Sequence, residues 1–259
     1  MNSPCDTASL FSLRGLVAVV TGAGARGGIG HAIALGFSRA GAQLAIADCD
    51  AEGLATTAAE LTLIGAPPLA CACDIAEEAD VERLFAAVTA RYGRVDVLVN
   101  VPFSFNRRAA PHEIDIADWE RAVAVNLTGY LRCCQHALRD MLTRGAAGSL
   151  INIGSNGGVG ALGRGALIYG CSKAAVHQLT RELAVEYAAS GIRCNALLPA
   201  QTHTPGLAAH LENQDFRDQV LPRMLAGLPQ GRLLQPEDYV GPAIFLASAA
   251  AAAVNGVLL

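Results

Sequence analysis

The chain contains 259 residues, of which 52% are hydrophobic and 16% charged, and it carries a formal net charge of −4. This composition favours a compact globule with a sizeable core over a disordered chain, and the lack of a basic block argues against a nucleic-acid partner. Eight cysteines without a Cys-x-x-Cys pair argue against a metal site or a disulfide framework. They predict small core residues in a reducing, cytoplasmic setting.

Residues 1–13 show little pattern and are expected to form a tail, which lacks the features of a secretion signal. An apolar run over 16–20 predicts the first buried strand, and apolar periodicity over 29–40 predicts the first helix. Between them lies the glycine-rich segment 21–30, TGAGARGGIG. Glycines at a strand–helix junction let the backbone approach a pyrophosphate, to which the helix N-terminus offers N–H donors. The segment therefore predicts a dinucleotide-binding loop.

The second expected strand, over 43–48, ends on an acidic residue, Asp48. A carboxylate at about this distance from the glycines meets the ribose hydroxyls of NAD, and it would repel the additional phosphate of NADP. Arg26 in the loop is a basic group that argues for NADP, but we expect it to point at solvent or at the diphosphate. The sequence therefore predicts NAD in preference to NADP.

Helices and strands continue to alternate along the chain. Further helices are expected over 51–64 and 77–92, and from an N-cap at Asp118 to about residue 143; further strands are expected over 69–73, 95–100, 149–154 and 192–198. Strands that alternate with helices of this length imply right-handed crossovers and a parallel sheet. The predicted fold class is α/β, a single-domain Rossmann-type doubly wound sheet with helices on both faces.

Residues 239–259 carry no charge, but glycine, proline and asparagine interrupt the segment. A membrane span needs about 20 predominantly apolar residues. We therefore expect a buried helix followed by a strand, and no association with a membrane.

The segment 166–191 has apolar residues at helical spacing and ends on Gly191, which is typical of a helix C-terminus. On this helix Tyr169 and Lys173 lie four residues apart and project from one face. A free phenol has a pKa of about 10, and a nearby ammonium favours the phenolate and lowers that value. The pair is a candidate proton-transfer device, although an isolated pair of this spacing is more often an ordinary exposed helix face.

Polar residues and a proline follow the expected strands at their carboxyl ends, where ligands bind in a parallel sheet. They are Asp48, Asp74, Asn100, Ser155 and Pro199. Taken singly, Asp74 fits a helix cap and Ser155 a turn residue, and Asn126 fits a helix-kink residue. The common position of so many groups at one edge of the sheet favours a shared site.

Together these segments resemble the short-chain dehydrogenase/reductase family in its single-domain form, over nearly the whole chain. The Tyr169-x-x-x-Lys173 pair and Ser155 match members of the catalytic tetrad of that family, and Asn126 in Val125-Asn126-Leu127-x-Gly129 matches the fourth. The resemblance implies an NAD(P)-binding domain over 14–259 that interconverts a secondary alcohol and a ketone by hydride transfer.

The resemblance also implies a role for each member of the tetrad. Tyr169 would be the general acid or base, and Lys173 would lower its pKa and bond the nicotinamide ribose. Ser155 would hold the substrate oxygen, and Asn126 would anchor a water molecule. Cofactor contacts are implied for residues of the loop, the strand ends and the tetrad: Gly22, Gly28, Ile29, Gly30, Asp48, Asp74, Ile75, Asn100, Tyr169, Lys173, Pro199 and Thr204.

The chain departs from the family pattern near the expected cofactor. The glycine-rich loop is longer than usual between Gly22 and Gly28. Val101-Pro102-Phe103 stands where Asn-Ala-Gly is usual, and Ala200 replaces the glycine that usually follows Pro199. A phenylalanine in place of glycine is expected to reshape the floor of the site.

Substrate recognition is expected from segments 103–108 and 156–165 and from a lid over about 201–228. Within them Arg107, Arg108 and His203 are candidates for contact with an anionic group. The expected partners are a small-molecule alcohol or carbonyl substrate and further copies of the chain, paired as a homotetramer or dimer. Three alternatives stay open: a nicotinamide-binding regulator, a structural subunit, and an epimerase or dehydratase without net redox turnover.

Overall fold

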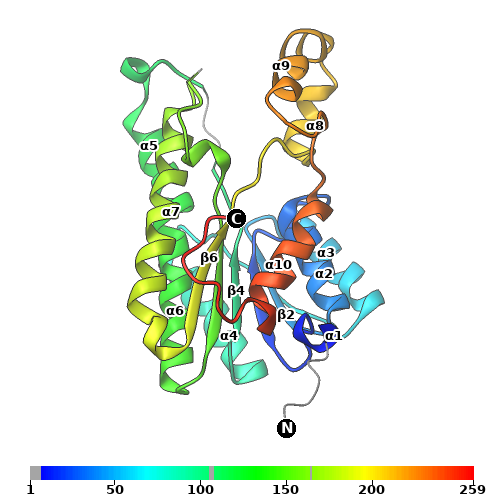
Figure 1. Cartoon of the computed structure of the whole chain (residues 1–259), viewed down its shortest axis with the longest axis vertical. Coiled ribbons are helices and arrows are strands. Elements are labelled where there is room, and N and C mark those ends of the chain that lie inside the picture. Colours follow the sequence, from blue (N-terminus) through cyan, green and yellow to red (C-terminus); the bar gives the residue numbers. More distant parts are fainter. Residues whose placement is uncertain (1–6, 105–107, 164) are drawn as a thin grey trace.

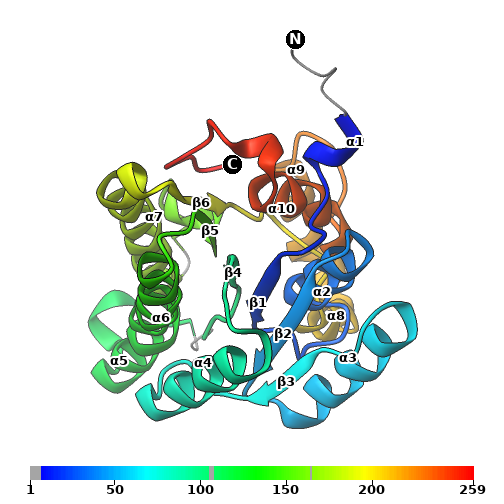
Figure 2. The same ribbon diagram turned by 90° about the horizontal axis from the view of Figure 1, so that it is seen from below.

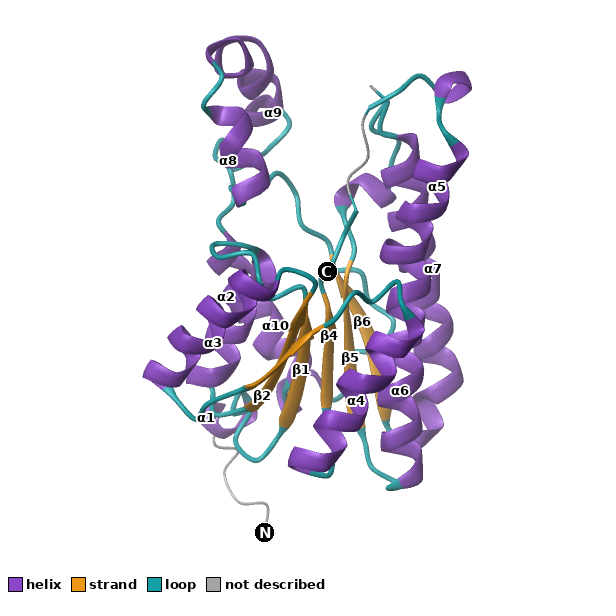
Figure 3. Ribbon diagram, turned by 180° about the vertical axis from the view of Figure 1, so that it is seen from behind, coloured by secondary structure: helices purple, strands orange, loops and turns teal. Residues whose placement is uncertain are grey.

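The computed structural model describes residues 7–104, 108–163 and 165–259, which form one parallel six-stranded sheet (Figure 3). The strand order is β3-β2-β1-β4-β5-β6. The order changes direction between β1 and β4, and a sheet of this kind binds its ligand at such a switch point. The strands are β1 (Val17–Thr21), β2 (Gln43–Asp48), β3 (Leu69–Ala72), β4 (Val97–Asn100), β5 (Gly148–Ile153) and β6 (Ile192–Leu197).

Helices cover both faces of the sheet, as Figure 2 shows. One face carries α2 (Ile29–Arg39), α3 (Ala51–Ile64) and α10 (Val240–Ala247); the other carries α4 (Glu78–Tyr92), α6 (Gly129–Thr143) and α7 (Leu167–Tyr187). Each face has its own cluster of buried apolar residues. All residues of β1 and β4 are buried, because both of their faces are covered. The predicted fold class is confirmed.

The start of the helix before Asn126 is a correction to the sequence prediction. Helix α5 (Ile116–Val123) begins after Asp115, whose side chain accepts a hydrogen bond from the backbone N–H of Ala117 at 2.9 Å. Asp118 is therefore in the first turn and is not the cap. Two acidic residues three positions apart are typical of a helix start, and the first of them caps while the second benefits from the helix dipole.

Two groups of elements rise above the carboxyl edge of the sheet (Figure 1). On one side stand α5 and the loop that precedes α7; on the other stand α8 (Pro205–Leu211) and α9 (Leu221–Ala226), joined by a π-helical turn over 216–220. The second group corresponds to the expected lid. It contains no strand and no buried residue within α8 and α9, which is consistent with few contacts to the sheet.

The two ends of the described chain pack on the sheet. A short helix, α1 (Thr7–Leu10), precedes Leu13, which is fully buried in the core although it was placed in a tail. The uncharged C-terminal segment forms α10 as predicted, but a single bridge between Ala196 and Leu258 takes the place of the expected strand. Among the described residues, the structure contains no helix that is both long and apolar enough to span a membrane.

The cysteines largely follow the prediction of small core residues. Cys73, Cys133, Cys134 and Cys194 are buried, whereas Cys49 and Cys171 are exposed, and all seven described cysteines are free thiols. The oligomeric state stays a prediction. Helices α6 and α7 leave several apolar side chains exposed: Leu131, Leu142, Leu167 and Val185.

Candidate active site

The structure brings Ser155 and Tyr169 together above the end of β5. Ser155 follows β5 and begins a short 3-10 turn over 156–158, in which its Oγ accepts a hydrogen bond from the backbone N–H of Gly157 at 3.0 Å. The Tyr169 phenol, in the first turn of α7, lies close enough to the Ser155 side chain for that side chain to favour the phenolate. Ser155 is 4% exposed, whereas Tyr169 is half-buried.

Lys173 lies one turn after Tyr169 and is almost completely buried. It is the only lysine among the 19 basic residues of the chain. Its Nζ donates to the carbonyl of Ile153 at 2.7 Å and to the hydroxyl of Tyr130 at 3.4 Å, and it also lies 5.1 Å from the centre of the Tyr130 ring. None of these partners is a carboxylate, and burial lowers the pKa of Lys173 to about 7.

Tyr169 does not show the lowered pKa that the sequence predicts. Burial raises the pKa of Tyr169, and the neighbouring Ser155 side chain only opposes that rise. The physical reason is that Lys173 is desolvated as well, so the amine that should stabilise the phenolate loses charge near neutral pH. In the protein without cofactor, the phenol is therefore protonated at neutral pH and suited to donate a proton.

Tyr130 belongs to the site but was not predicted from the sequence. It is fully buried at the start of α6, and its hydroxyl donates to the carbonyl of Pro102 at 2.9 Å. It thereby joins the altered Val101–Phe103 segment to Lys173. The only signal in the sequence is an aromatic residue directly after Gly129, which does not distinguish a core residue from a site residue.

Asn126 lies in a π-helical turn over 124–128, between α5 and α6, and is fully buried. Its amide donates to the hydroxyl of Ser172 at 3.0 Å and accepts from the backbone N–H of Ser104 at 2.7 Å. A π-turn inside a helix is frequent at functional sites. The asparagine thus fastens the segment after β4 to α7, and its role in holding a water molecule stays a prediction.

The glycine-rich loop fits a diphosphate. Gly22 has a φ of +73°, and a β-carbon at Gly30 would collide with the carbonyl oxygen of Gly22, so the turn is as tight as a close ligand approach requires. Gly28 caps α2 without a side-chain hydrogen bond, which leaves the first N–H groups of the helix for an anion, and Ile29 begins the helix.

The additional loop residues turn away from the tight glycine turn. Arg26 forms an ion pair with Glu60 at 2.9 Å, and His31 contacts the same carboxylate at 2.9 Å. A β-carbon at Gly27 would lie 4.0 Å from Pro205, the first residue of α8. The longer loop therefore reaches α3 on one side and the start of the lid on the other.

Asp48 lies at the end of β2 and faces the loop. Its Oδ2 accepts from the backbone N–H of Gly24 at 2.7 Å, and its Oδ1 accepts from that of Asp50 at 3.0 Å. A β-carbon at Gly24 would lie 2.8 Å from the carboxyl carbon of Asp48. The carboxylate is therefore fixed where the sequence predicts a contact with a ribose.

The other predicted cofactor residues have partners within the protein. Asp74 accepts from the backbone N–H of Ala76 at 2.9 Å and pairs with Arg121 at 2.7 Å. Asn100 is fully buried and donates to Asn152 at 3.0 Å, so its amide joins β4 to β5. Their cofactor contacts stay predictions, as do those of Ile75, Pro199 and Thr204 at the same edge of the sheet. Ile75 packs against Gly129, the carbonyl of Pro199 accepts a hydrogen bond from the backbone N–H of Asn156, and Thr204 is the N-cap of α8.

The expected substrate segments are only partly described. Arg107 lies outside the described residues; Arg108 lies next to Gly165, and His203 is exposed at the base of the lid. Phe103 is 56% exposed, and its ring meets Tyr169 edge-on with 6.5 Å between the ring centres. Leu162 packs over Gly157, beside Ser155. Apolar surface thus adjoins the two hydroxyl groups.

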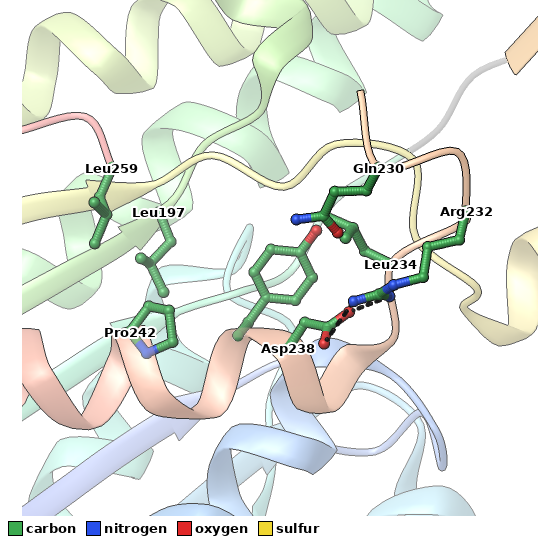
Figure 4. A pocket seen from close by; sticks show the side chains of 8 residues that line it. Leu197, Gln230, Arg232, Leu234, Asp238, Pro242 and Leu259 are labelled. Carbon is green, nitrogen blue, oxygen red and sulfur yellow. Dashed lines mark hydrogen bonds and ion pairs between the residues drawn. The ribbon is translucent and has the colours of Figure 1, made fainter. Parts of the chain in front are cut away.

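A cavity of about 310 Å³ lies between the end of β6, α10 and the chain end at Leu259 (Figure 4). The Arg232–Asp238 ion pair lines it together with Tyr239, whose hydroxyl is 2.8 Å from that of Thr202. It shares no residue with the tetrad. The cavity is therefore separate from the candidate catalytic residues.

The chain is similar to known proteins over nearly its whole length. A family model described as Enoyl-(Acyl carrier protein) reductase matches residues 22–259. The chain is 39% identical over 244 residues to cis-4-hydroxycyclohexanecarboxylate dehydrogenase of Sinomonas cyclohexanicum, covering 94% of this chain and 93% of the relative. It is 36% identical over 246 residues to D-threitol dehydrogenase of Mycolicibacterium smegmatis, covering 95% and 91%. The solved structure of gluconate 5-dehydrogenase from Burkholderia cenocepacia J2315 in complex with NADP and tartrate superimposes with a TM-score of 0.87 at 35% identity, covering 97% of this chain and 95% of that one.

Proposed function

The chain belongs to the short-chain dehydrogenase/reductase family, and we propose that it is an oxidoreductase that uses NAD to interconvert a secondary alcohol and a ketone. The observation that carries this proposal is the position of the Ser155 side chain beside the Tyr169 phenol, one helical turn before the buried amine of Lys173. Both hydroxyl groups can address one substrate oxygen, as proton transfer at a carbonyl requires.

The side chains supply the proton and hold the oxygen. When bound, a nicotinamide cofactor accepts or donates the hydride. In the direction of reduction, the Tyr169 phenol gives its proton to the carbonyl oxygen while the carbonyl carbon gains the hydride, and a secondary alcohol results. The Ser155 hydroxyl donates to the same oxygen and stabilises the charge that develops there. Lys173 stabilises the phenolate that remains when its amine is protonated. In oxidation each transfer runs in reverse.

The substrate that this site favours has an apolar carbon skeleton next to the reacting oxygen. Phe103 and Leu162 present apolar surface beside Tyr169 and Ser155. An apolar ring gains from covering such surface, whereas each hydroxyl of a polyol loses a hydrogen bond to water there. A relative that acts on a cyclohexane ring is consistent with this expectation, although another relative acts on threitol.

The test is the absorbance of reduced nicotinamide during incubation with NAD and a panel of secondary alcohols. The panel contains cis-4-hydroxycyclohexanecarboxylate, D-threitol, sugars, other hydroxy acids and hydroxysteroids. We expect reduction of NAD, with a higher kcat/KM for the cyclic hydroxy acid than for threitol. Chromatography of the products identifies the alternatives, because an epimerase or dehydratase consumes substrate without net reduction of NAD. Cofactor binding with no conversion of any panel member would favour a regulator.

The preference for NAD rests on Asp48. Its carboxylate is fixed against the loop at Gly24, where it would lie close to the 2′-phosphate of NADP and repel it. Arg26, the basic group that could balance that phosphate, is paired with Glu60. The gluconate 5-dehydrogenase of Burkholderia cenocepacia was solved in complex with NADP. The preference of the present protein therefore has to be measured by comparing kcat/KM for NAD and for NADP directly.

We expect Asp48→Ser to exchange the cofactor preference. Loss of the carboxylate removes the repulsion of the phosphate and also removes an acceptor for the ribose hydroxyls, so kcat/KM should rise for NADP and fall for NAD, each by about tenfold or more. The control is Asp50→Ser, which removes a carboxylate two residues away but keeps an oxygen that can cap α3. Equal use of NADP by the original protein and by Asp48→Ser would contradict the assignment.

A further inference from the structure

We propose that His177 is a positioning residue that holds the catalytic Ser155 against α7. The imidazole is 3% exposed, and its Nε2 accepts a hydrogen bond from the backbone N–H of Ser155 at 3.3 Å. It does not touch the reacting atoms. The inference rests on the proposed function, since it concerns the placement of a residue that this function makes catalytic.

The glycines on either side of Ser155 create the space for the ring. A β-carbon at Gly154 would lie 2.5 Å from Nε2 of His177, and one at Gly158 would lie 2.6 Å from its Cε1. Since real β-carbons do not approach so closely, the imidazole excludes a side chain at Gly154. At Gly158 the ring and the α7 backbone at Lys173 and Ala174, 2.7 Å away, both exclude one. The backbone segment from Gly154 to Gly158, which contains Ser155, thus packs on the buried ring of His177.

The spacing on α7 links this contact to the catalytic pair. Tyr169, Lys173 and His177 follow one another at intervals of four residues, so they lie along one face of the helix. One rigid helix therefore carries the phenol and, two turns later, the group that fixes the backbone of Ser155. This sets the distance between the two hydroxyl groups, for which an error of about 1 Å can cost about 100-fold in rate.

The contact exists only when His177 is neutral, because a protonated Nε2 has no lone pair for the Ser155 N–H. The charged groups that face the imidazole are Lys173 and Arg181, both cations on α7; in the described chain, the Gly154–Gly158 turn that packs on the ring adds no charge. Burial and these cations lower the pKa of His177. Neutral pH therefore preserves the contact, and acid pH breaks it.

Two substitutions separate positioning from simple packing. In His177→Gln, the side-chain amide can still accept the hydrogen bond but cannot titrate; in His177→Leu, the acceptor is lost. We expect His177→Leu to lower kcat by about 10- to 100-fold at pH 7.5 while the KM for NAD stays within about twofold. His177→Gln should retain kcat within a few-fold at this pH and should lose the additional fall in kcat of the original protein at acid pH.

A second readout does not depend on turnover. In the ¹H–¹⁵N spectrum, the Ser155 amide should shift with pH as His177 titrates, and this shift should be absent in His177→Gln. Thermal unfolding identifies a variant that fails to fold. A folded His177→Leu protein with the original kcat, or a Ser155 amide that titrates equally in His177→Gln, would overturn the proposal. If the original protein turns over no alcohol but the amide shift is present, the proposed function fails while the contact stands.

Discussion

Tyr169→Phe is expected to lower kcat/KM for the alcohol by about 10³-fold while NAD binding and the fold stay unchanged. General acid–base catalysis contributes about 10²- to 10⁴-fold, and the substitution removes the proton donor but keeps the ring. The phenyl ring should keep its edge contact with Phe103, because that contact does not involve the hydroxyl. Ser155 remains in place to bind the substrate oxygen, so the loss should appear mainly in kcat.

The chain offers a matched control on the same helix. Tyr187 is a partly buried tyrosine at the end of α7, 18 residues beyond Tyr169, and Tyr187→Phe makes the same chemical change far from the site. Steady-state kinetics give kcat and KM, and quenching of the fluorescence of Trp119 on α5 by added cofactor gives an independent measure of binding. A kcat of Tyr169→Phe within tenfold of the original protein would exclude the phenol as the proton donor.

The sheet could be predicted from the sequence because each central strand is a continuous apolar run followed by a polar residue. Such a run is buried on both faces, and this requires helices on both sides. The helix bounds were less certain where polar residues offer several caps, as with Asp115 and Asp118. There the sequence contains two acceptable starts three residues apart, and only the folded chain selects one.

The candidate site could be predicted as a set of residue types but not as a set of contacts. The sequence places a phenol and an amine on one helix face. It does not reveal that burial lowers the pKa of Lys173 and raises the pKa of Tyr169. Tyr130 and His177 were missed for the same reason. Their roles arise from contacts with Lys173 and Ser155 across distant parts of the chain, whereas in the sequence each is only a residue on the apolar face of a helix.

The cofactor loop shows a related limit of the sequence pattern. The tight turn and the uncapped helix start that the glycines predict are present, and the phosphate contact itself stays a prediction. The direction of the additional residues could not be inferred, since Arg26 could reach either solvent or a ligand. Its partner, Glu60, lies on α3, one helix further along the chain.

Lys173→Met is expected to abolish turnover and at the same time to stabilise the protein. Methionine fills a similar volume without a charge, and the chain loses the cation that would stabilise the phenolate of Tyr169, so kcat should fall by about 10²-fold or more. The amine of Lys173 is buried among neutral partners. The carbonyl of Ile153 that the amine leaves lies 3.3 Å from the hydroxyl of Tyr130, but that hydroxyl has one proton and also donates to the carbonyl of Pro102 at 2.9 Å. The substitution therefore weakens one buried hydrogen bond, which offsets part of the stabilisation.

The pH dependence of this stabilisation follows from the pKa of Lys173, which burial lowers from an ordinary 10.5 to about 7. Between these values the unfolded chain binds a proton that the folded chain does not, so the free energy of unfolding rises with pH across this window. Below pH 7 the folded protein bears the full cost of a charged, desolvated amine, which amounts to at most about 5 kcal/mol. Lys173→Met should therefore raise Tm by several degrees at pH 6 and by almost nothing above about pH 11.

Because the chain contains one lysine, the amine itself can be observed directly. Protein labelled with ¹⁵N and ¹³C only at lysine gives a single side-chain signal, whose titration should show a midpoint near the lowered pKa of about 7. A midpoint above pH 9 would mean that Lys173 stays charged in the folded protein, and the stabilisation by methionine would then have to come from packing and be independent of pH. A midpoint near 7, together with a Tm difference that disappears at high pH, would show that the buried amine of Lys173 destabilises the fold. The protein would then retain this amine because Tyr169 needs a neighbouring group that can gain and lose a positive charge. Arginine supplies every other basic side chain of this protein but cannot serve there, since a guanidinium does not release its proton in proteins.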